Sequence, residues 1–127
     1  MNSMNPVVHF EIPAEDTARM ADFYTKAFGW KTEAMGEEMG NYVVVTTSEN
    51  DMNGRPKMGG TINGGFYPVK KEDPPQTPSL VIAVDDIREA VKKVAEAGGK
   101  ILGEPVEIPA AGLYVYNTSK IIFRIVA

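Results

Sequence analysis

The chain has 127 residues, of which 43% are hydrophobic and 24% charged, which suits one globular domain with a substantial core. Its formal charge is −4 and the sequence has no basic stripe, which argues against a nucleic-acid partner. It has no cysteine, which excludes disulfides, thiolate metal sites and thiol nucleophiles. Residues 1–6 lack the features of a signal peptide, and no apolar run approaches the roughly 20 residues of a membrane span. We therefore expect a cytoplasmic protein without a membrane partner.

The first half of the sequence predicts a strand, a helix and three further strands. Residues 7–12 alternate as a strand does, Asp16 suits a helix N-cap, and Gly29 suits the helix end. The expected apolar stripe of this helix is Met20, Phe23, Tyr24 and Ala27. Strand signals follow at 30–34, 42–47 and 60–67, with a polar and mobile loop expected at 48–57.

The second half predicts the same order of elements after a proline-rich linker. Residues 79–84 suit a strand, and Asp86 suits an N-cap with Glu89 at capping-box spacing. The helical stripe is Ile87, Val91 and Val94, and Gly98–Gly99 ends the helix. Strands are expected at 100–108, 113–116 and 121–126.

A shift of 70 positions aligns the two halves without gaps through the helix. His9 then falls on Ser79, Asp16 on Asp86, and Gly29 on Gly99. This predicts a duplicated half-domain within one domain of residues 1–127: module one at about 6–67, a linker at 68–78 and module two at about 79–127. The alternative is that two strand–helix units occur in any α+β chain.

Four segments carry a resemblance to a known family: HFEIPAEDTARMADFYTKAFGW (9–30), INGGFY (62–67), VDDIREAVKKVAEAGGKI (84–101) and EIPAAGLYVY (107–116). In this order and spacing they resemble the vicinal-oxygen-chelate superfamily of glyoxalases, bleomycin resistance proteins and extradiol dioxygenases. The resemblance implies an α+β fold of two βαβββ modules, whose curled sheets form a cleft. It also implies a homodimer.

The resemblance further implies where a metal site would lie. Metal-dependent members use a His on the first strand of each module and a carboxylate on the last. His9 matches the first position, but the second His position falls on Ser79 and the last carboxylate position on Arg124. Neither the strand expected at 60–67 nor residues 121–127 contain an acid. Because one ligand of four cannot hold a divalent ion usefully, we expect no metal and no cofactor.

The period of two along each strand predicts which residues would face the cleft. His9 and Glu11 share one face of the first strand, while Phe10 and Ile12 pack under the helix. In the second module Ser79, Val81 and Ala83 would share the cleft face with Arg124. The predicted ligand-binding residues are His9, Glu11, Asn63, Ser79, Tyr114 and Arg124.

Several of these residues admit more than one interpretation. Arg124 could pair with Glu11, bind a ligand carboxylate, or extend to solvent. Gly64–Gly65 could allow a ligand close to the backbone, or could mark a bulge in a curved sheet. The aromatic residues Trp30, Tyr42, Tyr67, Tyr114 and Tyr116 could line a pocket or belong to the core.

Three functions remain open from the sequence. The favoured hypothesis is a metal-free small-molecule-binding protein with a degenerate metal site. The alternative is a metal-dependent lyase, isomerase or dioxygenase whose ligand set recruits Glu11, Glu33 or a carboxylate of a partner chain. The third is a protein–protein or regulatory module. No catalytic residue is identified, and the sequence names neither the ligand nor the pairing of modules within or between chains.

Overall fold

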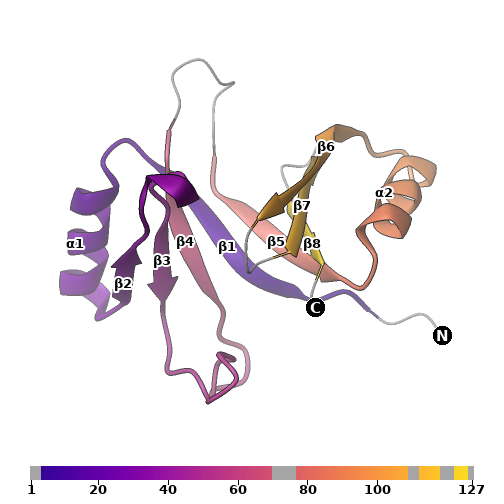
Figure 1. Cartoon of the computed structure of the whole chain (residues 1–127). Helices are drawn as coiled ribbons and strands as arrows, with labels where there is room; N and C mark the ends of the chain where they lie inside the picture. Colours follow the sequence, from indigo (N-terminus) through magenta and orange to yellow (C-terminus); the bar gives the residue numbers. More distant parts are fainter. Residues whose placement is uncertain (1–3, 70–76, 109–111, 118–121, 126–127) are drawn as a thin grey trace. The chain divides into compact units, whose positions relative to one another are not determined.

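The computed structural model of the chain describes residues 4–69, 77–108, 112–117 and 122–125, with side chains as far as Ile101. The chain divides into two compact units, His9–Pro78 and the combination of Met1–Val8 with Ser79–Ala127. Each unit contains one strand, one helix and three more strands in that order (Figure 1). The predicted α+β class with two βαβββ modules is therefore confirmed. No helix among the described residues is long and apolar enough to span a membrane.

The first unit contains helix α1 (Thr17–Phe28) and four strands in the order β2-β3-β4-β1. The strands are β1 (Val7–Ala14), β2 (Lys31–Ala34), β3 (Val43–Thr46) and β4 (Asn63–Pro68). β1 runs parallel to β4, and the other neighbours are antiparallel. β4 begins three residues later than predicted, because Gly60 adopts a left-handed φ of 83° inside the preceding loop. A short 3₁₀ turn at Glu37–Met39 was not predicted.

Helix α1 begins and ends where the sequence predicted. Asp16 accepts a hydrogen bond from the Arg19 amide at 3.0 Å, and Gly29 closes the helix with a φ of 73°. Two residues of the expected apolar stripe, Phe23 and Ala27, do not contact the core, since both are exposed. The other two, Met20 and Tyr24, are partly buried and pack on the sheet together with Ala21.

The core of this unit lies between α1 and one face of its sheet. Phe10 and Ile12 pack there, as the alternation along the strand predicted. Tyr24 stacks on Trp30 with ring centroids 4.7 Å apart. The core consists of Val43, Val45 and Phe66, surrounded by Phe10, Ile12, Met20, Ala21, Tyr24 and Trp30.

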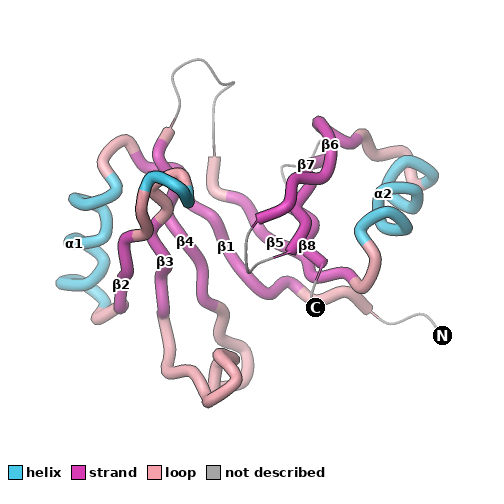
Figure 2. The backbone as a smooth tube through the Cα atoms, viewed as in Figure 1, coloured by secondary structure: helices cyan, strands magenta, loops and turns pink. Residues whose placement is uncertain are grey.

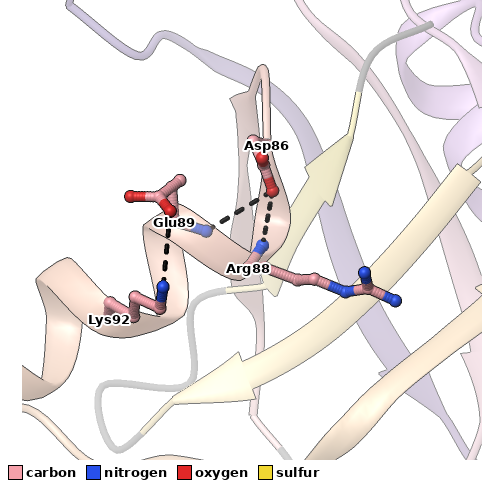
Figure 3. Close-up of polar contacts among 4 residues, drawn as sticks. All are labelled: Asp86, Arg88, Glu89 and Lys92. Atoms are coloured by element: carbon pink, nitrogen blue, oxygen red, sulfur yellow. Dashed lines mark hydrogen bonds and ion pairs between the residues drawn. The ribbon is translucent and has the colours of Figure 1, made fainter.

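The second unit repeats this arrangement with helix α2 (Ile87–Glu96) and strands in the order β5-β8-β7-β6. Asp86 caps α2 by accepting from the amides of Arg88 and Glu89, while the Glu89 carboxylate lies 3.5 Å from Lys92 Nζ (Figure 3). Ile82, Val84 and Ile87 belong to the core beneath the helix. The strands are β5 (Ser79–Val84), β6 (Ile101–Ile108), β7 (Gly112–Asn117) and β8 (Ile122–Ile125).

The predicted linker at 68–78 falls largely outside the described residues. Its first residue, Pro68, is the last residue of β4 instead. The adjacent Val69 amide donates to the Ala14 carbonyl at 3.0 Å, which continues the pairing of β4 with β1.

Two consecutive glycines in β4 allow aromatic rings to lie against both faces of the sheet. The predicted bulge is absent, because both neighbours of β4 pair with Gly64 and Gly65 in continuous register. A Cβ on Gly64 would lie 2.5 Å from the Phe10 ring, and one on Gly65 would overlap the Tyr42 hydroxyl. The glycines therefore accommodate the chain's own side chains.

We expect Gly64→Ala to destabilise the protein by about 1–3 kcal/mol, because the added methyl overpacks the core against Phe10. Gly59→Ala is the matched control, since nothing lies within 4 Å of its added Cβ and its φ is not left-handed. Urea unfolding followed by circular dichroism measures both changes. Equal effects at the two positions would contradict the overpacking.

Candidate functional site

The sheet face of the first unit that points away from α1 carries a group of polar side chains. His9 pairs with Asn63 and Glu11 pairs with Gly65 between the parallel strands β1 and β4, so these positions share one face. The Tyr42 hydroxyl lies over Gly65 and is 2.8 Å from Nε2 of His9. We call His9, Glu11, Tyr42, Asn63 and Tyr67 the polar face of this unit.

The polar face includes a buried carboxylate. Glu11 is only 8% exposed, and it is the one buried charged residue among the described side chains. Burial, and then the negative charge of Glu11, raise the pKa of Tyr67 above its ordinary value of 10.0. Tyr67 therefore keeps its proton at neutral pH and can donate a hydrogen bond.

A long loop joins β3 to β4 (Figure 2). Asn63, where β4 begins, holds this loop through Thr47 and Asn50. Its Oδ1 accepts from the Thr47 amide at 2.8 Å, and its Nδ2 donates to Oδ1 of Asn50 at 2.8 Å. Thr47 also donates its hydroxyl proton to the Ile62 carbonyl at 2.6 Å. Because both atoms of the Asn63 amide bind protein groups, its predicted contact with a ligand would compete with these bonds.

Ser79, Tyr114 and Arg124 lie in the second unit. Ser79 is the first residue of β5 and is half-buried. Position 124 in β8 pairs with Ala83 of β5 and with position 114 of β7. Paired positions share a sheet face, so the register places 114 and 124 on the face of Ser79, Val81 and Ala83. For position 124 this is the face that the alternation predicted.

The residues at the family's metal positions do not fit a divalent ion. Nε2 of His9 is hydrogen-bonded to Tyr42. Serine stands at position 79 and arginine at 124, and a guanidinium offers no lone pair to a cation. Within the described part of the chain, no three His, Cys, Asp or Glu residues lie close enough to hold a metal ion.

Sequence analysis missed the link between His9 and Tyr42. The signal that could have revealed it is the glycine pair in β4, since an aromatic residue often covers a glycine on the neighbouring strand. Tyr67 was named only as an aromatic residue of pocket or core, whereas its hydroxyl is influenced by the charge of Glu11.

A hollow of about 580 Å³ lies at the end of β2 and β3 where Lys31 pairs with Thr46. None of the predicted site residues lines it, but Thr47 and Asn50, which do, are hydrogen-bonded to Asn63. Its walls are ammonium, hydroxyl, amide and carboxylate groups, unlike the apolar walls usual for organic ligands. We assign no ligand to it. The lining residues are Gly29, Lys31, Thr46, Thr47, Ser48, Glu49, Asn50 and Lys57.

We expect a double-mutant cycle of His9→Ala and Tyr42→Phe to give a coupling energy of about 0.5–1.5 kcal/mol, the net contribution of a partly buried hydrogen bond. Urea unfolding of the four proteins measures it. Tyr24→Phe serves as the control for Tyr42→Phe, because Tyr24 packs on the opposite sheet face. A coupling near zero for His9 with Tyr42 would contradict the hydrogen bond.

We expect Tyr67 to make stability fall at alkaline pH. The folded chain raises the pKa of Tyr67, so its contribution is complete below the unfolded pKa of about 10 and is lost as pH rises through the folded pKa. Stability measured against pH should therefore decline less above pH 10 in Tyr67→Phe than in the wild type. Parallel curves for the two proteins would show that Tyr67 does not contribute.

Comparisons with known proteins agree with the resemblance. The sequence profile of the Glyoxalase/Bleomycin resistance protein/Dioxygenase superfamily matches residues 7–124. A glyoxylase-like domain-containing protein of Didymella fabae is 29% identical over 100 residues, which cover 77% of this chain and 72% of that protein.

Solved structures share the fold at low sequence identity. A hypothetical protein from Bacillus halodurans C-125 has a TM-score of 0.69 at 15% identity, covering 98% of this chain and 96% of that one. A methylmalonyl-CoA epimerase in complex with methylmalonyl-CoA and NH4+ has a TM-score of 0.70 at 14% identity, with coverage of 98% and 96%. The epimerase from Mycobacterium tuberculosis has a TM-score of 0.67 at 14% identity, with coverage of 100% and 93%. The chain belongs to the Glyoxalase/Bleomycin resistance protein/Dioxygenase superfamily.

Proposed function

We propose that the protein binds a small organic molecule without a metal ion. The proposed ligand-binding residues are His9, Glu11 and Asn63 of the first unit and Ser79, Tyr114 and Arg124 of the second. The single observation that carries this proposal is the hydrogen bond of His9 Nε2 to Tyr42 at 2.8 Å. It engages one ring nitrogen of the residue at the family's first metal position. Ser79 and Arg124 support the same conclusion, because they stand where the family resemblance implies a His and a carboxylate as metal ligands.

The polar groups suit a ligand with both hydrogen-bonding and charged parts. Tyr67 retains its proton, so its hydroxyl can donate to a ligand oxygen. Arg124 supplies a planar guanidinium that can bind a carboxylate in a bidentate manner. Its other possible roles are a pair with Glu11 and an extension into solvent. A similar structure, an epimerase, holds methylmalonyl-CoA, which supports an organic acid derivative as the ligand class.

The alternative is a metal-dependent lyase, isomerase or dioxygenase with a non-standard ligand set. Glu33, Val44, Gly65 and Glu11 form one continuous row across β2, β3, β4 and β1. Glu33 and Glu11 thus share a face but are three strand spacings apart, about 14 Å, which is too far to bind one ion together. Of the recruited ligands considered, Glu11 with a carboxylate from a partner chain therefore remains, and Glu11 with Glu33 does not.

We further propose that the protein is a cytoplasmic homodimer. The family resemblance implies the dimer, and the absence of cysteine from the sequence fits a reducing compartment. Light scattering of the purified protein measures the oligomeric state directly, and a mass of one chain would refute the dimer.

The metal-free proposal is tested by metal analysis and thermal melting. We expect protein purified without a His-tag to contain far less than one metal per chain. We also expect EDTA, Ni²⁺, Zn²⁺, Mn²⁺ and Fe²⁺ to leave its Tm unchanged. A metal at 100 times its Kd would add about 2.7 kcal/mol of stability, a shift of several degrees. One metal per chain together with a lower Tm in EDTA would establish the alternative.

The role of Arg124 is tested by screening small carboxylic acids for a rise in Tm. If Arg124 binds a ligand carboxylate, Arg124→Gln should weaken binding of any hit by about tenfold to a hundredfold, the loss expected for a charged hydrogen bond. Arg88→Gln is the control, because Arg88 is exposed on α2. Equal affinity in Arg124→Gln and Arg88→Gln would eliminate this role while leaving metal-free binding intact.

A further inference from the structure

The chain contains two Asn–Gly pairs in opposite environments, Asn53–Gly54 and Asn63–Gly64. In such a pair the backbone nitrogen of the glycine can attack the side-chain carbonyl carbon of the asparagine. Glycine favours this attack because it has no side chain to hinder the approach and its backbone adopts more conformations than any other residue's. Structure decides whether the attack can occur at each pair.

Asn53 lies at the tip of the loop between β3 and β4, and is exposed. Its backbone amide donates to Oδ1 of Asp51 at 2.9 Å, but among the described residues nothing holds its side-chain carboxamide. Gly54 follows with a φ of 77° and open space on its Cα. The carboxamide of Asn53 is therefore free to rotate toward the Gly54 nitrogen.

Asn63, in contrast to Asn53, has a fixed carboxamide and is followed by a buried glycine. Both atoms of its carboxamide are hydrogen-bonded, to Thr47 and Asn50. It lies in strand β4, and the next residue, Gly64, is buried beneath the Phe10 ring. Attack at this position would require opening of the sheet, which costs more free energy than opening an exposed turn.

We propose that Asn53 is a site of spontaneous deamidation, whereas Asn63 is protected. The Gly54 nitrogen forms a bond to Cγ of Asn53, the Cγ–Nδ2 bond breaks, and ammonia leaves with the proton of the Gly54 amide. Water then opens the cyclic imide at either carbonyl, which gives aspartate or isoaspartate. The net change is replacement of NH2 by OH, with a carboxylic acid that is ionised at neutral pH.

The turn around Asn53 sets the rate and the consequence of the reaction. Gly54 donates its N–H to the Asp51 carbonyl at 3.0 Å, so the nitrogen must first leave this bond. The turn is exposed, and such segments open at low free-energy cost. Isoaspartate would lengthen the backbone between Asp51 and Arg55, whose paired hydrogen bonds of 2.7 and 3.0 Å close the turn.

Deamidation of Asn53 would change the charge of the loop whose stem residues line the polar hollow. Glu49, Asn50 and Lys57 line the hollow, and the Lys57 amide donates to the Glu49 carbonyl at 2.9 Å. A new negative charge at position 53 would lie in a loop that already carries Asp51 and Glu49. Modified and unmodified chains should therefore differ in charge near Lys57.

Incubation of the full chain at mildly alkaline pH, followed by peptide mapping with mass spectrometry, tests the proposal. We expect a gain of one mass unit and isoaspartate at Asn53, at a rate at least about tenfold that at Asn63, because the folded sheet must open first. Asn53→Gln should abolish the fast phase, and denaturation in urea should bring the two sites to similar rates.

A synthetic peptide of residues 49–57 provides the unstructured reference rate. The proposal is overturned if Asn63 reacts as fast as Asn53 in the folded chain. It is also overturned if Asn53 in the folded chain reacts below about a hundredth of the peptide rate, since the turn would then protect it.

Discussion

The close approach of two aromatic rings to β4 is the constraint on which the first unit depends. Gly64 and Gly65 leave the strand without side chains at two successive positions, one on each face. Phe10 occupies the space on the helix side and joins the core of Val43, Val45 and Phe66. Tyr42 occupies the space on the opposite side, where its hydroxyl reaches His9. One dipeptide thus serves both the core and the polar face.

The same arrangement supports the proposal that the protein binds its ligand without a metal ion. A metal ion would neutralise a buried carboxylate such as Glu11 and would bind the nitrogen of His9. Here a phenol hydroxyl is hydrogen-bonded to Nε2 of His9, and burial, together with the charge of Glu11, raises the pKa of Tyr67. The polar face thus presents hydrogen-bonding groups, which fits the proposed recognition of an organic molecule.

Asparagine shows how context decides the chemistry of a residue. Asn63 ends the long loop by binding Thr47 and Asn50, while Asn53, ten positions earlier, extends into solvent. The loop at 48–57 was predicted to be mobile, and within it Asp51 forms a compact turn with Arg55. The mobility stays a prediction, but the turn shows that the loop has local order of its own.

The sequence by itself determined the order of elements, both helix N-caps, the end of α1 and the sides of β1 and β5 that meet the helices. These features depend on neighbours in the chain: Asp16 and Asp86 bind amides two or three residues away, and strand faces follow a period of two. Only the tertiary structure decided which residues of α1 pack on the sheet, why β4 carries two glycines, and that Tyr42 binds His9. Each of these depends on contacts between segments far apart in the sequence, whose distances no local pattern encodes.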